Sequence, residues 1–438
     1  EELYSILGSL RKLTREYLEY SRAEKRISIY YPDLYSVLKS SIKNHFEAER
    51  EINRLMLLAE SEDPGALSLF REVSSRVLDG FIQSLKVMGI EFNGFDFESS
   101  SIILRRAHEI VESVAKTGFA RVISGGALEV DLNTLASVDD RVKKLFYPDQ
   151  AGRFIIRRSD GTTLYVTRDI AYSIYKFKDL GANIVYNVIA VEQSREQKQL
   201  KAMLYLLGYP EYAENMHHFA YEMVHLKGMR MSGRRGIYYT IDEMIIDAKL
   251  KILDKLLEKT QMAKVDMIDV AEKLSIANTR AILLSVEPSK VLVFDPERIN
   301  EIEYGTMIEY SFVRLLGIIR NLWNLEYLEN PGEVHTKVLK TLNEARKVEL
   351  SIEEKRLVED LLRFKYTLIE AYREMKPNKI IEYAITISLD FNKFYEMYPI
   401  ITERDENKKR VRVLITALTL FILSELLDIL GFPKLSMM

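Results

Sequence analysis

A nearly continuous apolar run from Ile184 to Val191 constrains the fold more than any other feature of the sequence. Gly181 precedes the run, and a polar segment that begins at Glu192 follows it. Apolar runs of this length between turn signals are typical of strands that are covered on both faces, as in the parallel sheets of α/β proteins. We therefore expect an α/β fold in this part of the chain.

Strand and helix patterns alternate around this run. The turn signal at 159–161 is followed by residues 163–167, which predict a strand. An apolar stripe at 171–177 predicts a helix, and a second helix is expected over 195–207. Two strands with a helix between them predict a parallel pair with a right-handed crossover.

Polar side chains lie where these two strands are expected to end. Tyr165 and Asp169 come near the end of the first strand, and Glu192 and Gln193 follow the second. Ligands of open parallel sheets bind beyond the carboxyl ends of the strands. Tyr165, Asp169 and Gln193 suit a cationic ligand, because a carboxylate pairs with a guanidinium in fork geometry. The alternative is structural: Asp169 caps its helix and Tyr165 packs in the core.

A short basic loop at 227–236 combines three glycines with Arg230, Arg234 and Arg235. Glycine permits tight backbone geometry and arginine supplies fixed positive charge, so the loop suits a polyphosphate. The alternative is a basic hairpin tip that binds no ligand.

The remaining sequence is predominantly helical. A loop is expected at 329–336, around Pro331 and Gly332. Three helix starts are indicated by capping residues: Asp63 before Pro64, Thr240 with Glu243, and Ser351 with Glu354.

Composition excludes some classes of protein. The chain has no cysteine, so disulfides and thiolate metal sites are excluded, and its six histidines form no His-x-x-His pair. We therefore expect no metal held by the protein. No apolar run approaches the roughly 20 residues that span a bilayer, and no secretory signal opens the chain, so a cytosolic protein without a membrane partner is expected. The net charge of −3 does not exclude nucleic acid.

Residues 160–172 closely resemble the signature of the arginyl-tRNA synthetase family. The resemblance implies that Tyr165, Asp169 and Gln193 bind the substrate L-arginine. The helix that follows usually carries a His-x-x-Gln pair in this family; here Gln199 matches, but Glu196 replaces the histidine.

Residues 230–236 resemble the KMSKS loop of class I synthetases in its arginine-specific form, with Arg230 in place of the leading lysine. The resemblance implies catalytic roles for Arg230, Ser232 and Arg234. It assigns ATP binding to six residues, namely His218, Met223, Val224, Arg230, Met231 and Ser232.

The C-terminal third resembles the helical anticodon-binding domain of the same family, with Glu309 in place of the usual glutamine. This part of the resemblance implies that Tyr310, Arg314 and Met437 contact tRNA. Unpaired anticodon bases would stack on aromatic side chains such as Tyr310.

Together these features predict an α/β plus all-α protein: the second half of a class I Rossmann-like catalytic domain, followed by an α-helical anticodon-binding bundle of the DALR type. The expected segments are a helical insertion or connector at 1–115, the Rossmann-like half at 116–226, the KMSKS-like loop with connecting helices at 227–285, and the anticodon-binding domain at 286–438. The implied function is ligation of L-arginine to tRNA(Arg) with ATP and substrate-associated Mg²⁺.

The HIGH motif of class I synthetases has no counterpart in this sequence, which begins at Glu1. We therefore expect the HIGH-containing N-terminal part to be supplied by a separate polypeptide, to have been removed, or to have been lost. The alternative function is a catalytically inactive tRNA-binding paralogue or fragment of the same family. A cysteinyl-tRNA synthetase is excluded, because that enzyme needs a thiolate zinc site.

Overall fold

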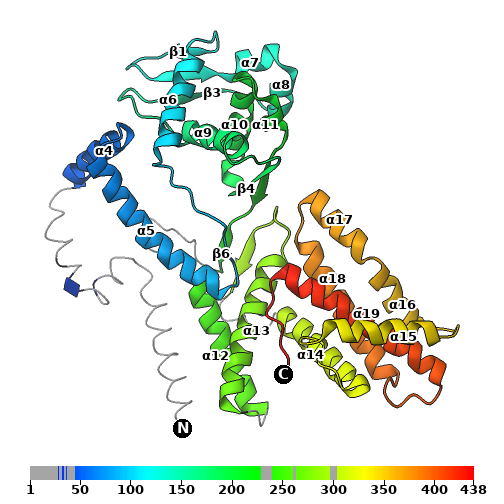
Figure 1. Ribbon diagram of the computed structural model, residues 1–438. Helices are drawn as coiled ribbons and strands as arrows, with labels where there is room; N and C mark the ends of the chain where they lie inside the picture. The colour runs from blue at the N-terminus through cyan, green and yellow to red at the C-terminus, as the bar shows by residue number, and fades with distance from the viewer. Residues whose placement is uncertain are drawn as a thin grey trace. The chain divides into compact units, whose positions relative to one another are not determined.

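The structure is a computed structural model that describes residues 28, 32–33, 36, 45–227, 239–259, 263–295 and 303–438. These residues form two compact units (Figure 1). The α/β unit comprises the described residues of 33–86 and 91–223. The helical unit comprises those of 1–32, 87–90 and 224–438. The division into four segments stays a prediction.

The α/β unit contains a three-stranded antiparallel sheet in the order β1-β2-β3 and a parallel pair, β4-β5. In chain order its elements are α4 (His45–Glu60), α5 (Pro64–Val87, whose last residue belongs to the helical unit), α6 (Ser101–Ala115), β1 (Ala120–Val122), β2 (Leu128–Asp131), α7 (Leu132–Val138), α8 (Asp140–Phe146), β3 (Arg153–Arg157), α9 (Tyr165–Lys178), β4 (Val185–Ala190), the 3₁₀ turn η1 (Val191–Gln193), α10 (Ser194–Leu206), α11 (Pro210–Glu214) and β5 (Met216–Tyr221).

The apolar run at 184–191 forms strand β4, and the helix predicted over 195–207 is α10, so both predictions are confirmed. The expected coverage of both strand faces is wrong. Val185 and Asn187 are buried, whereas Tyr186 and Val188 are 43% and 63% exposed. Within the described residues β4 pairs with β5 alone, and the buried Val185 packs in a cluster with side chains of α9, α10 and α11. One face of the strand therefore stays open there.

The strand predicted at 163–167 is wrong. Thr163 forms a single bridge with Arg157 after the turn at Gly161, which has a φ of +93°. Helix α9 then begins at Tyr165. The β-branched residues of this segment suggested a strand, but the Thr167 hydroxyl donates to the carbonyl oxygen of Ile156 at 2.7 Å and so ties the first turn of α9 to β3. The parallel partner of β4 is consequently β5, not residues 163–167.

The helical unit begins with a short parallel pair, β6-β7. Its elements are β6 (Val224–Leu226), α12 (Ile241–Lys259), α13 (Lys264–Leu284), β7 (Leu292–Phe294), α14 (Tyr304–Trp323), α15 (Pro331–Glu344), α16 (Ile352–Leu362), α17 (Phe364–Glu374), α18 (Asn378–Met397) and α19 (Glu406–Leu430). The loop expected at 329–336 is wrong, because Pro331 occupies the first turn of α15, where its missing N–H costs nothing.

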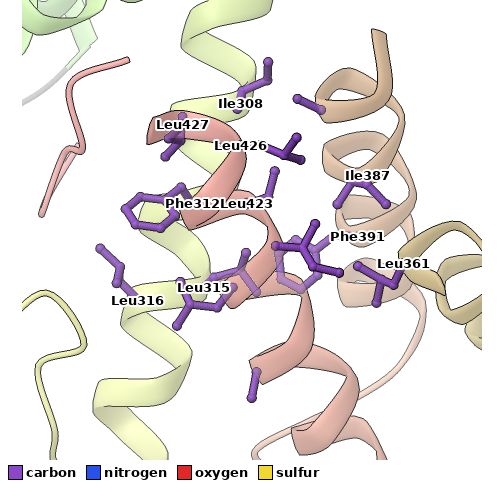
Figure 2. Close-up of a cluster of buried hydrophobic side chains, with 14 of the residues drawn as sticks. Ile308, Phe312, Leu315, Leu316, Leu361, Ile387, Phe391, Leu423, Leu426 and Leu427 are labelled. Atoms are coloured by element: carbon purple, nitrogen blue, oxygen red, sulfur yellow. The ribbon is translucent and has the colours of Figure 1, made fainter. Parts of the chain in front are cut away.

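Helix α19 contacts α14, α15, α16 and α18 in the C-terminal part of the helical unit (Figure 1). Figure 2 shows the core that these helices share, in which Phe312 of α14, Phe391 of α18 and Leu423 of α19 are fully buried. By length and composition α19 could cross a membrane, so the expectation that no such apolar run exists is wrong. Because 67% of its most apolar stretch is buried inside the protein, α19 has the character of a core helix.

Close backbone packing joins α13 to α14. A Cβ atom on Gly305 would lie 2.5 Å from the backbone of Ala277 and Asn278, so only glycine fits there. Asn278 bonds twice to Thr306, donating to its hydroxyl and accepting from its N–H, both at 2.8 Å. The three predicted helix starts are also confirmed, with bonds from Ala66 N–H to Asp63 and within the pairs Thr240–Glu243 and Ser351–Glu354.

Candidate functional site

Two helix starts meet in the α/β unit through a side-chain hydrogen bond. Tyr165, the first residue of α9, donates its phenolic proton to Oε1 of Glu196 at 3.0 Å. Glu196 lies in the first turn of α10. Burial and the hydrogen bond to Glu196 raise the pKa of Tyr165. The phenol therefore stays protonated, and its 42% exposure leaves part of the side chain accessible to a ligand.

Asp169 lies one helical turn after Tyr165 on the same face of α9. It is half-buried, and its carboxylate has no hydrogen bond or ion pair with any described residue. Burial, followed by the negative charge of Glu98, raises the pKa of Asp169 to about 6, although Lys176 and Arg168 act in the opposite direction. A half-buried carboxylate without a bonded cation is a favourable place for a cationic ligand.

Arg168 does not neutralise Asp169, because its guanidinium is occupied elsewhere. Nη1 donates to the carbonyl oxygen of Thr163 at 2.7 Å and pairs with Glu60 of α4 at 3.1 Å. Nε pairs with Glu98. Arg168 therefore fixes the entry into α9 and forms no ion pair with Asp169.

A polar chain continues along the same face of α9. Lys176 donates to Oδ1 of Asn187 on β4 at 3.1 Å, and Asn187 donates to Gln197 of α10 at 2.9 Å. Lys176 also lies 4.2 Å from the centre of the Tyr172 ring, and burial lowers the pKa of its ammonium group. These contacts hold α9, β4 and α10 together beneath the candidate site.

Gln193 is exposed and ends the turn η1, directly before α10. It stands three residues before Glu196, and its side chain makes no hydrogen bond with a described residue. The three-residue pocket therefore stays a prediction. The structural alternative for Tyr165 is wrong, because its ring is not in the core, and Asp169 caps no helix.

Sequence reasoning missed the partners of the site. The sequence pattern gives Glu196 only as a departure from a family motif, and it assigns no role to Glu98, to Lys176, or to Asp96, which accepts from the Tyr172 hydroxyl at 2.8 Å. The spacing of Tyr165, Asp169, Tyr172 and Lys176 places all four on one helical face, and this signal was available once a helix was assigned there. Glu98 and Asp96 lie about 70 residues earlier in the chain and carry no such signal.

A cavity of about 200 Å³ in the α/β unit lies next to the candidate site. Arg168 and Glu98 line one part of it, and most of the remaining wall is apolar, with Met56, Phe70 and Phe97. Neither Tyr165 nor Asp169 lines this cavity, so it is a separate feature from the site at the start of α9.

The predicted ATP-binding residues are only partly described. His218 lies within β5, and its Nε2 is 2.9 Å from the carbonyl oxygen of Ile189. Met223 is 41% exposed after β5, and Val224 begins β6 of the helical unit. Arg230, Met231, Ser232 and Arg234 lie outside the described residues. Among the residues that the structure does describe, no group of three or more metal-ligating side chains occurs.

In the helical unit the side chain of Arg314 contacts two partly exposed aromatic rings. The Arg314 guanidinium lies 4.6 Å from the ring centre of Tyr310 and 4.8 Å from that of Tyr395. It also donates to the Tyr310 hydroxyl at 2.6 Å and to Asn392 at 2.8 Å. Tyr310 and Tyr395 remain 45% and 39% exposed. Exposed aromatic rings beside a cation suit unpaired nucleic acid bases.

The C-terminal tail lies against the same helix, α14. The N–H of Leu435 donates to Oε2 of the buried Glu309 at 3.2 Å, and Leu435 and Met438 pack in one cluster with Val313. Burial raises the pKa of Glu309 to about 8. Met437 is exposed, so the tail presents this side chain to solvent.

The sequence matches two known protein families and several curated relatives. Residues 11–287 match the catalytic domain family described as tRNA synthetases class I (R), and residues 308–438 match the DALR anticodon binding domain. The arginine–tRNA ligase of Korarchaeum cryptofilum is 31% identical over 96% of this chain, and that of Sulfurisphaera tokodaii is 32% identical over 93%. The chain spans 65% and 63% of the lengths of these two relatives.

Solved structures show the same fold. Thermus thermophilus arginyl-tRNA synthetase matches with a TM-score of 0.72 at 21% identity, covering 93% of this chain and 69% of that one. The Plasmodium falciparum arginyl-tRNA synthetase matches with a TM-score of 0.68 at 16% identity, covering 95% and 67%.

The α/β unit and the helical anticodon-binding bundle together define a class I aminoacyl-tRNA synthetase. The family match covers well over half of the chain. This chain belongs to the arginyl-tRNA synthetase family.

Proposed function

We propose that this chain binds L-arginine and tRNA(Arg) as part of an arginine–tRNA ligase that works in the cytoplasm. In the proposed reaction the arginine carboxylate attacks the α-phosphate of ATP, which forms arginyl-adenylate and releases pyrophosphate. A ribose hydroxyl at the 3′ end of the tRNA then attacks the arginyl carbonyl, loses its proton and releases AMP. ATP enters as its Mg²⁺ complex, so the metal is part of the substrate.

The observation that carries this proposal is the half-buried carboxylate of Asp169, which has no bonded cation among the described residues and lies on the same face of α9 as Tyr165. In the proposed complex Asp169 binds the guanidinium, and Tyr165 and Gln193 orient it. Arg230, Ser232 and Arg234 would stabilise the charge that develops on pyrophosphate, which is mainly an electrostatic contribution. His218, Met223 and Val224 would hold the adenosine. The activation step needs no general base, because the attacking group is already a carboxylate.

The exposed rings of Tyr310 and Tyr395, with Arg314 between them, support the tRNA part of the proposal. Unpaired anticodon bases would stack on Tyr310, and Arg314 and Met437 would contact the same loop.

The proposal is tested by titrating the chain with L-arginine and with tRNA(Arg), and by measuring arginine-dependent exchange of pyrophosphate into ATP. The 438 residues contain no His-x-x-His pair, so exchange is measured with and without an added HIGH-motif fragment from a relative. Arginine binding and exchange that needs the fragment support a ligase whose activity requires a HIGH-containing part. Binding of tRNA without any exchange in either arm supports the alternative, a tRNA-binding member of the family. Failure to bind arginine contradicts the proposed function.

A further inference from the structure

Tyr165 and Glu196 form a hydrogen bond whose direction is fixed by chemistry. A phenolic hydroxyl can donate one proton and can also accept, whereas a carboxylate can only accept. In this pair Tyr165 donates to Oε1 of Glu196 at 3.0 Å. The phenol has then used its only proton, so its oxygen can serve a third group only as an acceptor.

The other oxygen of the carboxylate strengthens this arrangement. Oε2 of Glu196 is buried and has no hydrogen-bond partner among the described residues. The Tyr165 hydroxyl is therefore the one donor that the described part of the chain offers to this carboxylate. Reversing the phenol would leave both carboxylate oxygens unpaired, which costs far more than a bond to water would recover.

Tyr165 and Asp169 both face a ligand as hydrogen-bond acceptors. One turn from Tyr165, the half-buried Asp169 presents a second group that accepts without donating. A guanidinium is complementary to these two acceptors, because it carries five N–H donors and no acceptor. A ureido group has nearly the same planar shape, but a carbonyl oxygen replaces one NH₂ group with its two N–H donors, and this oxygen needs a donor from the protein.

We propose that Glu196 is a positioning residue that holds Tyr165 as a hydrogen-bond acceptor and so makes the site select a guanidinium over a ureido group. This inference rests on the proposed function, because it concerns the same arginine site. A histidine, the residue that the family pattern places here, can donate or accept according to its tautomer. Glutamate removes that freedom.

The test compares binding of L-arginine and L-citrulline, its ureido analogue, by isothermal titration calorimetry. In Glu196→Gln the amide can turn its NH₂ toward the phenol, which frees the Tyr165 hydroxyl to donate to the ureido oxygen. We expect arginine affinity to fall about tenfold, because the Tyr165 hydroxyl changes from an acceptor to a donor. The arginine-to-citrulline affinity ratio should fall by more than that, because citrulline gains the hydrogen bond that arginine loses. Glu211→Gln, an exposed glutamate of α11, is the matched control and should leave the ratio unchanged.

A double-mutant cycle separates this hydrogen bond from a general loss of negative charge. Tyr165→Phe should lower the ratio as Glu196→Gln does, and adding Glu196→Gln to Tyr165→Phe should change it no further. The melting temperature of each variant without ligand confirms that it is folded; if Glu196→Gln does not fold, the ratio in Tyr165→Phe decides. Two results would overturn this inference and leave the proposed function standing. One is an arginine-to-citrulline affinity ratio that is unchanged in Glu196→Gln. The other is a fall in this ratio on Glu196→Gln that is equally large with and without Tyr165→Phe. If the wild-type chain binds no arginine, the proposed function itself is contradicted, and the inference that rests on it falls with it.

Discussion

Replacing Glu309 by glutamine should make the helical unit more stable at neutral and alkaline pH. Glu309 is fully buried in α14, and its pKa is raised to about 8 from an ordinary value of 4.5, chiefly by burial. The hydrogen bond from the Leu435 N–H, followed by the charges of Lys273 and Lys434, lowers the pKa but does not cancel the effect of burial. Each of the two lysines pairs with another carboxylate, Asp269 at 2.8 Å and Asp428 at 2.6 Å. Glu309 therefore resides in the core without a cation bonded to it.

The direction of the effect follows from proton linkage. Because the folded pKa lies above the unfolded one, the folded state keeps its full stability below about pH 4.5 and loses stability as the pH rises toward 8. The loss is about 1.4 kcal/mol per pH unit, which gives about 5 kcal/mol once both states are ionised. Glutamine stays neutral throughout, and its carbonyl oxygen can still accept from Leu435, as Oε2 does now at 3.2 Å.

Trp323 allows a direct measurement, since it is the only tryptophan, lies on the same helix as Glu309 and packs against the helical core. Urea unfolding followed by its fluorescence should give nearly equal free energies of unfolding for wild type and Glu309→Gln at pH 5. The two should diverge steadily up to pH 8.5, with the variant more stable. Glu329→Gln, at an exposed glutamate, should follow the wild type at every pH. Parallel pH curves for wild type and Glu309→Gln would refute the reasoning.

Three further predictions concern other parts of the chain. Arginine affinity should fall about tenfold per pH unit below pH 6, where Asp169 takes up a proton, and be constant above pH 7; calorimetric titrations across this range test it, and Asp169→Asn should abolish the dependence. Gly305→Ala should lower the free energy of unfolding by about 3 kcal/mol through the clash with α13, while Gly317→Ala, with open space around it, should raise it slightly in the same urea titration. Tyr310→Ala should weaken tRNA(Arg) binding by about 1–3 kcal/mol in a filter-binding assay; an equal loss in Tyr366→Ala on α17 would contradict a specific stacking site.

The sequence predicted those elements whose signals are local. The apolar run that became β4, and the caps at Asp63 and Ser351, depend on neighbouring residues only, and these elements are where they were expected. The start of α9 was mistaken for a strand because Thr163 and Thr167 are β-branched. A contact from Thr167 to β3 decides the matter, and no local pattern encodes that contact.

In the candidate site, too, the sequence predicted what depends on local spacing and not what depends on long-range contacts. Tyr165 and Asp169 were found from a motif, and their spacing of four residues suffices to place them on one helical face. The charge environment of Asp169 could not be predicted, because Glu98 reaches it from a distant segment and Arg168 is diverted to Glu60 and Thr163. Such environments depend on long-range packing, which the sequence does not display.

Two glutamates in this chain, Glu196 and Glu309, stand where the family pattern expects a histidine and a glutamine, and burial decides what each does. Both have one buried carboxylate oxygen without a partner among the described residues. Glu309 receives a single backbone N–H and is sealed in the core, so its carboxyl is favoured as the neutral acid and imitates the expected glutamine. Glu196 is only half-buried and receives the proton of a phenol that is itself open to a ligand. The same acidic side chain therefore serves as a substitute amide in one unit and as a fixed acceptor in the other. Glu309→Gln should therefore leave arginine selectivity unchanged, and Glu196→Gln should leave the pH dependence of unfolding reported by Trp323 unchanged.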